Sequence, residues 1–99
     1  MTLRKKQSKF TQMVGLLILF AYAEGYELTF GDAYATSGHI EESFHYKRLA
    51  IDLNLFRDGK YLVETSDHAP LGIFWESLGG TWGGHFGDGN HYSWGERSE

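Results

Sequence analysis

Two histidines and two aspartates in this chain have the types and spacing of a catalytic zinc site. His45 lies seven positions before Asp52, and Asp88 lies three positions before His91. Two imidazoles and one carboxylate are the smallest protein ligand set that holds zinc and leaves a fourth position open. We therefore interpret His45, Asp52 and His91 as candidate ligands and Asp88 as a candidate general base, which predicts a small zinc hydrolase.

Each of these residues also has an ordinary structural explanation. A histidine is more often a surface or core residue than a metal ligand, and the chain has five. A solvated strand face explains Asp52, and a tight turn explains the segment Asp88-Gly89-Asn90. The other three histidines are weaker candidates in predicted loops and at a predicted helix start: His39, His68 and His85. Spacing alone leaves the metal site a hypothesis.

The composition fits one globular domain in which any metal would have His and carboxylate ligands. The 99 residues are 41% hydrophobic and 22% charged, which excludes a disordered chain and allows one modest core. The sequence contains no cysteine, which excludes disulfides and thiolate zinc sites.

The charge distribution argues against nucleic acid as a partner. The net charge is −4, and residues 51–99 carry three Lys or Arg against eight Asp or Glu, so this half would repel phosphate. The basic residues near the N-terminus are interpreted as a solvated helix face: Arg4, Lys5, Lys6 and Lys9.

The apolar residues 13–23 have two competing interpretations. One is a secretory signal with a small-x-small cleavage site at Ala21-Tyr22-Ala23. The other is a structural helix that Thr2 caps and Gly25 ends. The helical period of the apolar residues favours the structural helix, so the signal-peptide interpretation of residues 1–23 is disfavoured. The segment is also too short for stable insertion across a membrane.

Alternating apolar residues predict strands over 26–30 and 49–56. In the second strand four aliphatic side chains are expected to face the core: Leu49, Ile51, Leu53 and Leu55. Asp52 then falls on the opposite face, with Ala50 and Asn54. His45 lies an odd number of residues from Asp52, so the two can converge only if His45 precedes the strand on a turn or bulge.

The second half of the chain predicts a hairpin, a helix and a last strand. Asp58-Gly59 indicates a two-residue turn into a strand over 61–63. A helix is expected to start at Asp67-His68-Ala69-Pro70 and to end at Gly79-Gly80. Residues 81–89 are predicted to be an irregular loop, 91–94 a strand, and 95–99 a flexible tail.

Four motifs together resemble one peptidase family. They are Ser43-x-His45-x-x-x-x-Ala50-x-Asp52, Asp88-x-x-His91, Gly31-Asp32-Ala33-Tyr34 and Trp82-Gly83-Gly84-x-Phe86. The combination is similar to the zinc-dependent D-Ala-D-Ala carboxypeptidases and L-alanyl-D-glutamate endopeptidases, and most of all to their bacteriophage endolysin branch. The resemblance covers nearly the whole chain.

The resemblance implies an α+β fold of the hedgehog and DD-peptidase kind, with a small antiparallel sheet flanked by helices. Residues 1–99 would be a single catalytic domain that holds one zinc ion through His45, Asp52 and His91. Asp88 would be the general base in the hydrolysis of a peptide bond in the peptidoglycan stem peptide. The implied enzyme is a monomeric endolysin that stays in the host cytoplasm until another protein opens the inner membrane.

Two positions depart from the family pattern. Relatives commonly have an arginine, which helps to stabilise the transition state, where this chain has Ala35, and a glycine where it has Arg48. Arg48 is either a replacement for that positive charge or a solvated residue at the strand start. The candidate substrate-binding residues are Tyr34, Arg48, Trp82 and His85.

The departures leave two alternatives to an L-alanyl-D-glutamate endopeptidase. The first is a D-Ala-D-Ala carboxypeptidase, which would remove the terminal D-Ala of the same stem peptide. The second is a non-catalytic, metal-stabilised module that binds the cell wall without cutting it.

Overall fold

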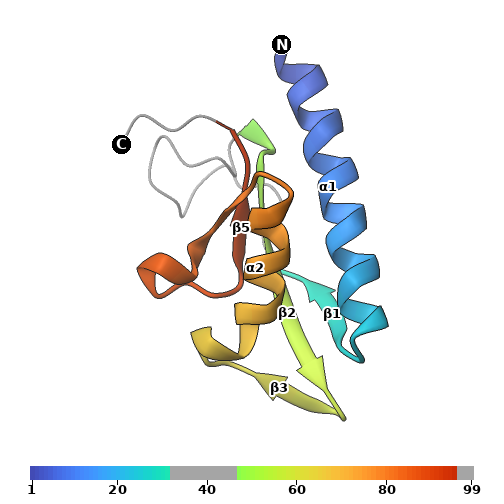
Figure 1. The fold of residues 1–99 in the computed structure, drawn as a ribbon, viewed down its shortest axis with the longest axis vertical. Coiled ribbons are helices and arrows are strands. Elements are labelled where there is room, and N and C mark those ends of the chain that lie inside the picture. Colours follow the sequence, from blue (N-terminus) through green and yellow to red (C-terminus); the bar gives the residue numbers. More distant parts are fainter. Residues whose placement is uncertain (32–46, 96–99) are drawn as a thin grey trace.

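A computed structural model of the chain describes residues 1–31 and 47–95. This part of the chain forms an α+β domain with two α-helices and five short strands in one antiparallel sheet, as the sequence predicts (Figure 1). The predictions for Tyr34, Ala35, His39 and His45, and for the tail after residue 95, lie outside the described residues.

The first helix, α1, spans Leu3–Ala23 and has the predicted signals at both ends. The Thr2 hydroxyl accepts a hydrogen bond from the Lys5 backbone N–H at 3.2 Å and so caps the first turn. Gly25 has a φ of 89°, and the Tyr26 N–H donates to the Ala21 carbonyl at 2.9 Å. This is the bonding pattern by which a left-handed glycine ends a helix.

One face of α1 belongs to the hydrophobic core, as expected for a structural helix. Its buried residues recur at the spacing of one helix face: Phe10, Met13, Val14, Leu17 and Ala21. Leu3, an apolar residue in the first helical turn, is instead 51% exposed. Within residues 1–31 and 47–95, no helix combines the length and apolar character needed to cross a membrane.

The sheet is built around its longest strand. The strands are β1 (Glu27–Phe30), β2 (Ala50–Arg57), β3 (Lys60–Leu62), β4 (Thr81–Trp82) and β5 (His91–Ser93). They follow the order β1-β2-β5-β4, with β3 also paired to β2. β1 lies along one edge of β2, while β5 and β3 pair with the start and the end of its other edge.

The alternation predicted for β2 is confirmed. The four aliphatic residues are buried: Leu49, Ile51, Leu53 and Leu55. Asp52 and Asn54 are half-buried on the opposite face. Ala50 is also buried, with only 1% exposed, so the face that carries Asp52 is covered near the strand start.

The hairpin and the second helix also lie where the sequence predicts them. Asp58 and Gly59 have φ values of 53° and 77°, the left-handed conformation required at both positions of the two-residue turn. The second helix, α2, spans Ala69–Ser77 and follows a 3₁₀ turn, η2, over Thr65–His68. Asp67 accepts the Glu64 backbone N–H at 3.2 Å, so it caps η2 rather than α2.

The prediction of an irregular loop over 81–89 is wrong for residues 81–86. Thr81–Trp82 forms strand β4 beside β5, and Gly83–Phe86 forms a 3₁₀ turn, η3. The glycines conceal this order in the sequence, because glycine has weak local preferences and the pairing partner of β4 lies about ten residues later.

Candidate metal centre

The structure brings together Asp52 and His91, two of the three predicted ligands. They are partners in the β2–β5 ladder, and His91 Nδ1 lies 3.1 Å from Asp52 Oδ1. Backbone hydrogen bonds join Leu53 to Asn90 on one side and Leu49 to the residue after β5 on the other. Asp52 and His91 therefore occupy a non-hydrogen-bonded pair, the position at which opposing side chains lie closest.

The donor set of this pair fits zinc. Two protein ligands on one tetrahedral zinc, each about 2.1 Å from the metal, are separated by about 3.4 Å. The 3.1 Å between Asp52 Oδ1 and His91 Nδ1 is close to that separation, and the two side chains are 20% and 17% exposed. Partial burial weakens competition from water while keeping the pair accessible. Asp52 and His91 can thus hold a metal that a third ligand completes.

The third predicted ligand, His45, precedes β2 and lies outside the described residues. Among residues 1–31 and 47–95, no group of three or more His, Cys, Asp or Glu side chains is arranged to hold a metal. The described part of the chain therefore contains two of the three predicted ligands, Asp52 and His91. The prediction that His45 lies on a turn before the strand stays a prediction.

The backbone of Asp52 is held in place by Gly31, on the side of β2 that faces β1. The Gly31 N–H, just after β1, donates to the Asp52 carbonyl at 2.7 Å. A Cβ at Gly31 would lie 3.1 Å from the Asp52 Cβ and 3.2 Å from its carbonyl oxygen, so a side chain here would press on Asp52. The first glycine of the Gly31-Asp32-Ala33-Tyr34 motif thus has a local role, which is to let β1 approach Asp52.

Asp88, the predicted base, lies on an exposed loop between η3 and β5. Its N–H donates to the Gly83 carbonyl at 3.0 Å, and its carbonyl accepts from the His91 N–H at 3.2 Å. Gly83 is closely packed at this turn, because a Cβ there would lie 2.5 Å from the Asp88 carbonyl oxygen and 2.8 Å from the His91 Cβ. The backbone therefore ties the predicted base directly to a predicted ligand.

Trp82 supports the loop that contains Asp88 and Gly89. Its side chain is almost fully buried, and its indole N–H donates to the Gly89 carbonyl at 2.7 Å. The ring packs directly on two glycines, since a Cβ at Gly72 or Gly84 would approach it to 2.1 or 2.2 Å. These contacts describe a residue that positions the Asp88 loop. The predicted contact of Trp82 with substrate stays a prediction.

His85 forms an exposed pair with Glu76, a residue that the sequence analysis missed. His85 Nε2 lies 3.0 Å from Glu76 Oε2, and the same carboxylate accepts the Trp82 backbone N–H at 3.3 Å. The hydrogen bond from His85 is the main cause that lowers the pKa of the Glu76 carboxyl. The pair fastens η3 to α2, and the exposed imidazole remains accessible to a ligand.

Arg48, the other departure from the family pattern, has a left-handed backbone with a φ of 58° directly before β2. It is exposed and borders a cavity of about 290 Å³ between α1 and the sheet. The walls of this cavity are mostly apolar and include Phe10, Val14 and Phe30. A positive φ is uncommon for a residue other than glycine, so the backbone conformation of Arg48 is an unusual local feature at the start of β2.

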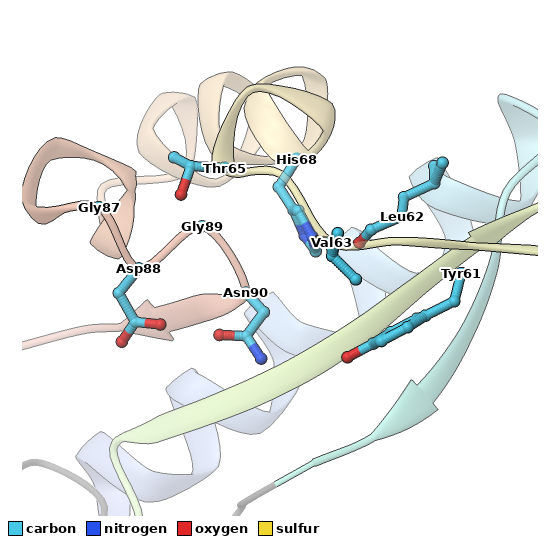
Figure 2. Close-up of a pocket in the computed structure, with 9 residues that line it drawn as sticks. All are labelled: Tyr61, Leu62, Val63, Thr65, His68, Gly87, Asp88, Gly89 and Asn90. Atoms are coloured by element: carbon cyan, nitrogen blue, oxygen red, sulfur yellow. Dashed lines mark hydrogen bonds between the residues drawn. The ribbon is translucent and has the colours of Figure 1, made fainter.

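A second, polar cavity of about 160 Å³ lies beside Asp88 (Figure 2). Sequence reasoning did not find it, because its walls come from two separate segments, 61–68 and 87–90. It includes His68, which is 3% exposed and whose Nε2 lies 3.1 Å from the Leu62 carbonyl. Burial lowers the pKa of His68 below 6.5, against smaller opposing effects of that hydrogen bond and of Asp67 and Asp88.

Comparison with models of known protein families and with curated proteins gives no match for this chain. The site is therefore judged by its own geometry: a carboxylate and an imidazole at the separation of metal ligands, with a second carboxylate on the adjoining turn.

Proposed function

We propose that this protein is a zinc-dependent peptidase that hydrolyses a bond in the peptidoglycan stem peptide. The observation that carries the proposal is the pairing of Asp52 with His91 across β2 and β5, at 3.1 Å and partly buried. Asp88, an acid three residues before His91, adds the candidate base on the adjoining turn. The motif resemblance supplies the substrate class.

The roles of the chain's residues follow from their chemistry. His45, Asp52 and His91 would hold the zinc, which supplies a Lewis acid that polarises the scissile carbonyl. Asp88 accepts a proton from the attacking water and donates it to the leaving amine, as a carboxylate general base does. The hydrogen bond from the His91 N–H to the Asp88 carbonyl keeps Asp88 next to Asp52 and His91, and it leaves the Asp88 carboxylate unused.

Within this class, we propose cleavage of the L-alanyl-D-glutamate bond, the endolysin activity that would lyse a host cell. The support is the combined motif pattern, in which the Trp82-Gly83-Gly84 segment precedes Asp88 and His91. Loss of a terminal D-Ala would instead identify a carboxypeptidase. Binding to the wall without any cleavage would identify a recognition module.

Asp88→Asn tests the proposal directly. The variant should keep its zinc and lose about 10²- to 10⁴-fold in activity, because the general base is removed while the ligands stay. Mass spectrometry of muropeptides from purified peptidoglycan, with and without a chelator, measures the activity. Metal analysis measures the bound zinc.

Asp58→Asn is the matched control, since it removes an exposed carboxylate from a turn position where asparagine tolerates a positive φ. It should leave both zinc and activity unchanged. Intact muropeptides after incubation with the zinc-loaded wild-type protein would reject the enzymatic proposal.

A further inference from the structure

The polar cavity begins at the predicted base and is lined by segments 61–68 and 87–90. Figure 2 shows Asp88 and Tyr61 at its two ends, with Asn90 between them and with Thr65 and His68 across the cavity. The Asp88 end of the cavity adjoins the proposed ligand His91, whose backbone N–H donates to the Asp88 carbonyl. A substrate held at Asp88 can therefore place a neighbouring group in this cavity.

The fixed charge around the cavity is negative. Of its nine lining residues, Asp88 is the one with an acidic side chain, and the lining contains no Lys or Arg. Asp67 lies near enough to act on His68 by its charge, as Asp88 does. A cavity lined by one sign of charge concentrates ligands of the other sign, so this one favours a cation.

The uncharged side chains of the cavity supply acceptor oxygens, although Thr65 and Asn90 can also donate. The hydroxyls of Tyr61 and Thr65 and the amide oxygen of Asn90 can each accept a hydrogen bond. Tyr61 donates its own proton to Asn54 Oδ1 at 3.5 Å, which leaves its oxygen as an acceptor. These groups suit a ligand that only donates.

His68 adds no positive charge that would oppose a cation. Its Nε2 faces the Leu62 carbonyl, an acceptor, so Nε2 carries the proton and Nδ1 carries the lone pair. Nδ1 is buried and has no hydrogen-bond partner in the described part of the chain. Because burial lowers the pKa of this imidazole, the ring stays neutral near pH 7 beside two carboxylates.

We propose that this cavity is a subsite for a primary ammonium group of the substrate. An ammonium has three donors and no acceptor, which matches the acceptors and the negative field. Stem peptides carry a diamino acid whose side-chain amine is such a group, and a cavity of about 160 Å³ admits the end of an amino-alkyl chain. The choice of the stem peptide rests on the proposed function, whereas the preference for an ammonium rests on the cavity itself.

Binding of two matched peptides to the zinc-loaded protein tests the subsite. The probe is N-acetyl-γ-D-glutamyl-L-lysyl-D-alanine, which lacks the bond proposed to be cut, and its partner carries ε-N-acetyl-lysine instead. Titration calorimetry should give at least about tenfold tighter binding for the lysine peptide, the size of effect for a charged hydrogen-bonded group. Equal affinities would reject the subsite.

Thr65→Lys places a competing ammonium in the cavity and should abolish the preference for the lysine peptide, with bound zinc unchanged. Thr65→Gln tests whether a longer neutral side chain is tolerated, and it should keep the preference. Ser66→Lys adds the same charge at an exposed neighbour that does not line the cavity, and it should also keep it. A preference that survives Thr65→Lys would reject the subsite.

The subsite and the proposed reaction can fail separately. Muropeptides cut equally well with lysine and with ε-N-acetyl-lysine would reject the subsite and leave the peptidase proposal standing. A lysine preference that Thr65→Lys abolishes, in a protein that leaves peptidoglycan uncut, would support the subsite and reject the proposed reaction.

Discussion

Asp52 and Asn54 lie two positions apart on the same face of β2, yet their partners differ in kind. The Asn54 amide donates to Thr29 Oγ1 at 3.3 Å and accepts from the Tyr61 hydroxyl at 3.5 Å. Both of these partners are neutral, and they come from β1 and from β3. Asp52 instead faces the His91 imidazole on β5 at 3.1 Å.

The difference separates a structural polar contact from a candidate functional one. Neutral hydrogen bonds join three strands and need no change of protonation, so Asn54 serves the sheet. A carboxylate facing an imidazole at metal-ligand separation offers two donor atoms for one cation. β2 therefore has one half that pairs with β1 and β3 through neutral contacts, and one half beside β5 that carries the candidate metal ligand Asp52.

The largest expected effect is on zinc binding by Asp52 and His91, the proposed ligands where β2 pairs with β5. Asp52→Ala or His91→Ala should lower zinc affinity by at least about 100-fold, because even residues that only support metal ligands can cost that much. Asn54→Ala should retain zinc and cost about 0.5–1.5 kcal/mol of unfolding free energy, the usual value of a lost hydrogen bond.

Competition with a chromophoric chelator measures the zinc affinity, and urea unfolding measures the stability. Equal zinc affinity in Asp52→Ala and Asn54→Ala would remove the distinction between the two halves of β2.

A smaller effect is expected from the turn that carries the base. Gly83→Ala should lower the unfolding free energy by about 1–3 kcal/mol, since the new Cβ would overlap a rigid backbone carbonyl. That carbonyl belongs to Asp88, at 2.5 Å from the Cβ position. Because the turn also bonds His91, its displacement should weaken zinc binding as well. A general loss of stability would not by itself weaken zinc binding in the folded protein.

Gly15→Ala is the matched control for this prediction. Gly15 lies inside α1, and a Cβ there meets nothing within 4 Å. Alanine should raise the unfolding free energy by about 0.5–1 kcal/mol, because it restricts the unfolded chain. If Gly83→Ala were as mild as Gly15→Ala, the turn would be looser than its contacts indicate.

The smallest expected effect comes from the buried His68. His68 is 3% exposed and its pKa is lowered by burial, so the unfolded chain binds a proton more readily than the folded chain does. Stability should therefore fall as pH drops through 6.5 towards the lower folded pKa of His68. At pH values above this window His68 is neutral in the folded and the unfolded chain, so its titration does not change the stability.

His68→Gln should be less stable near neutral pH but lose less stability on acidification, because the titrating group is gone. Urea unfolding of both proteins at a series of values from about pH 7.5 to about pH 5.5 measures the two slopes. Parallel slopes would show that His68 does not contribute to the acid sensitivity.

Local chemistry was sufficient to predict most of the fold. Thr2 and Gly25 mark the ends of α1, Asp58-Gly59 marks the hairpin, and period-two burial marks β2, because each signal acts within a few neighbouring residues. The same rules place Asp52 on the face opposite the aliphatic core.

Long-range packing decided the rest. Periodicity assigns Asp52 to a face but does not name the strand beside it, and its partner His91 lies 39 residues away. The burial of Trp82 depends likewise on Gly72, which lies on α2 and meets the indole ring only when the helix packs against the sheet. Register and close packing depend on the whole set of contacts at once, so residue types and spacing alone could name the candidate chemistry but not assemble it.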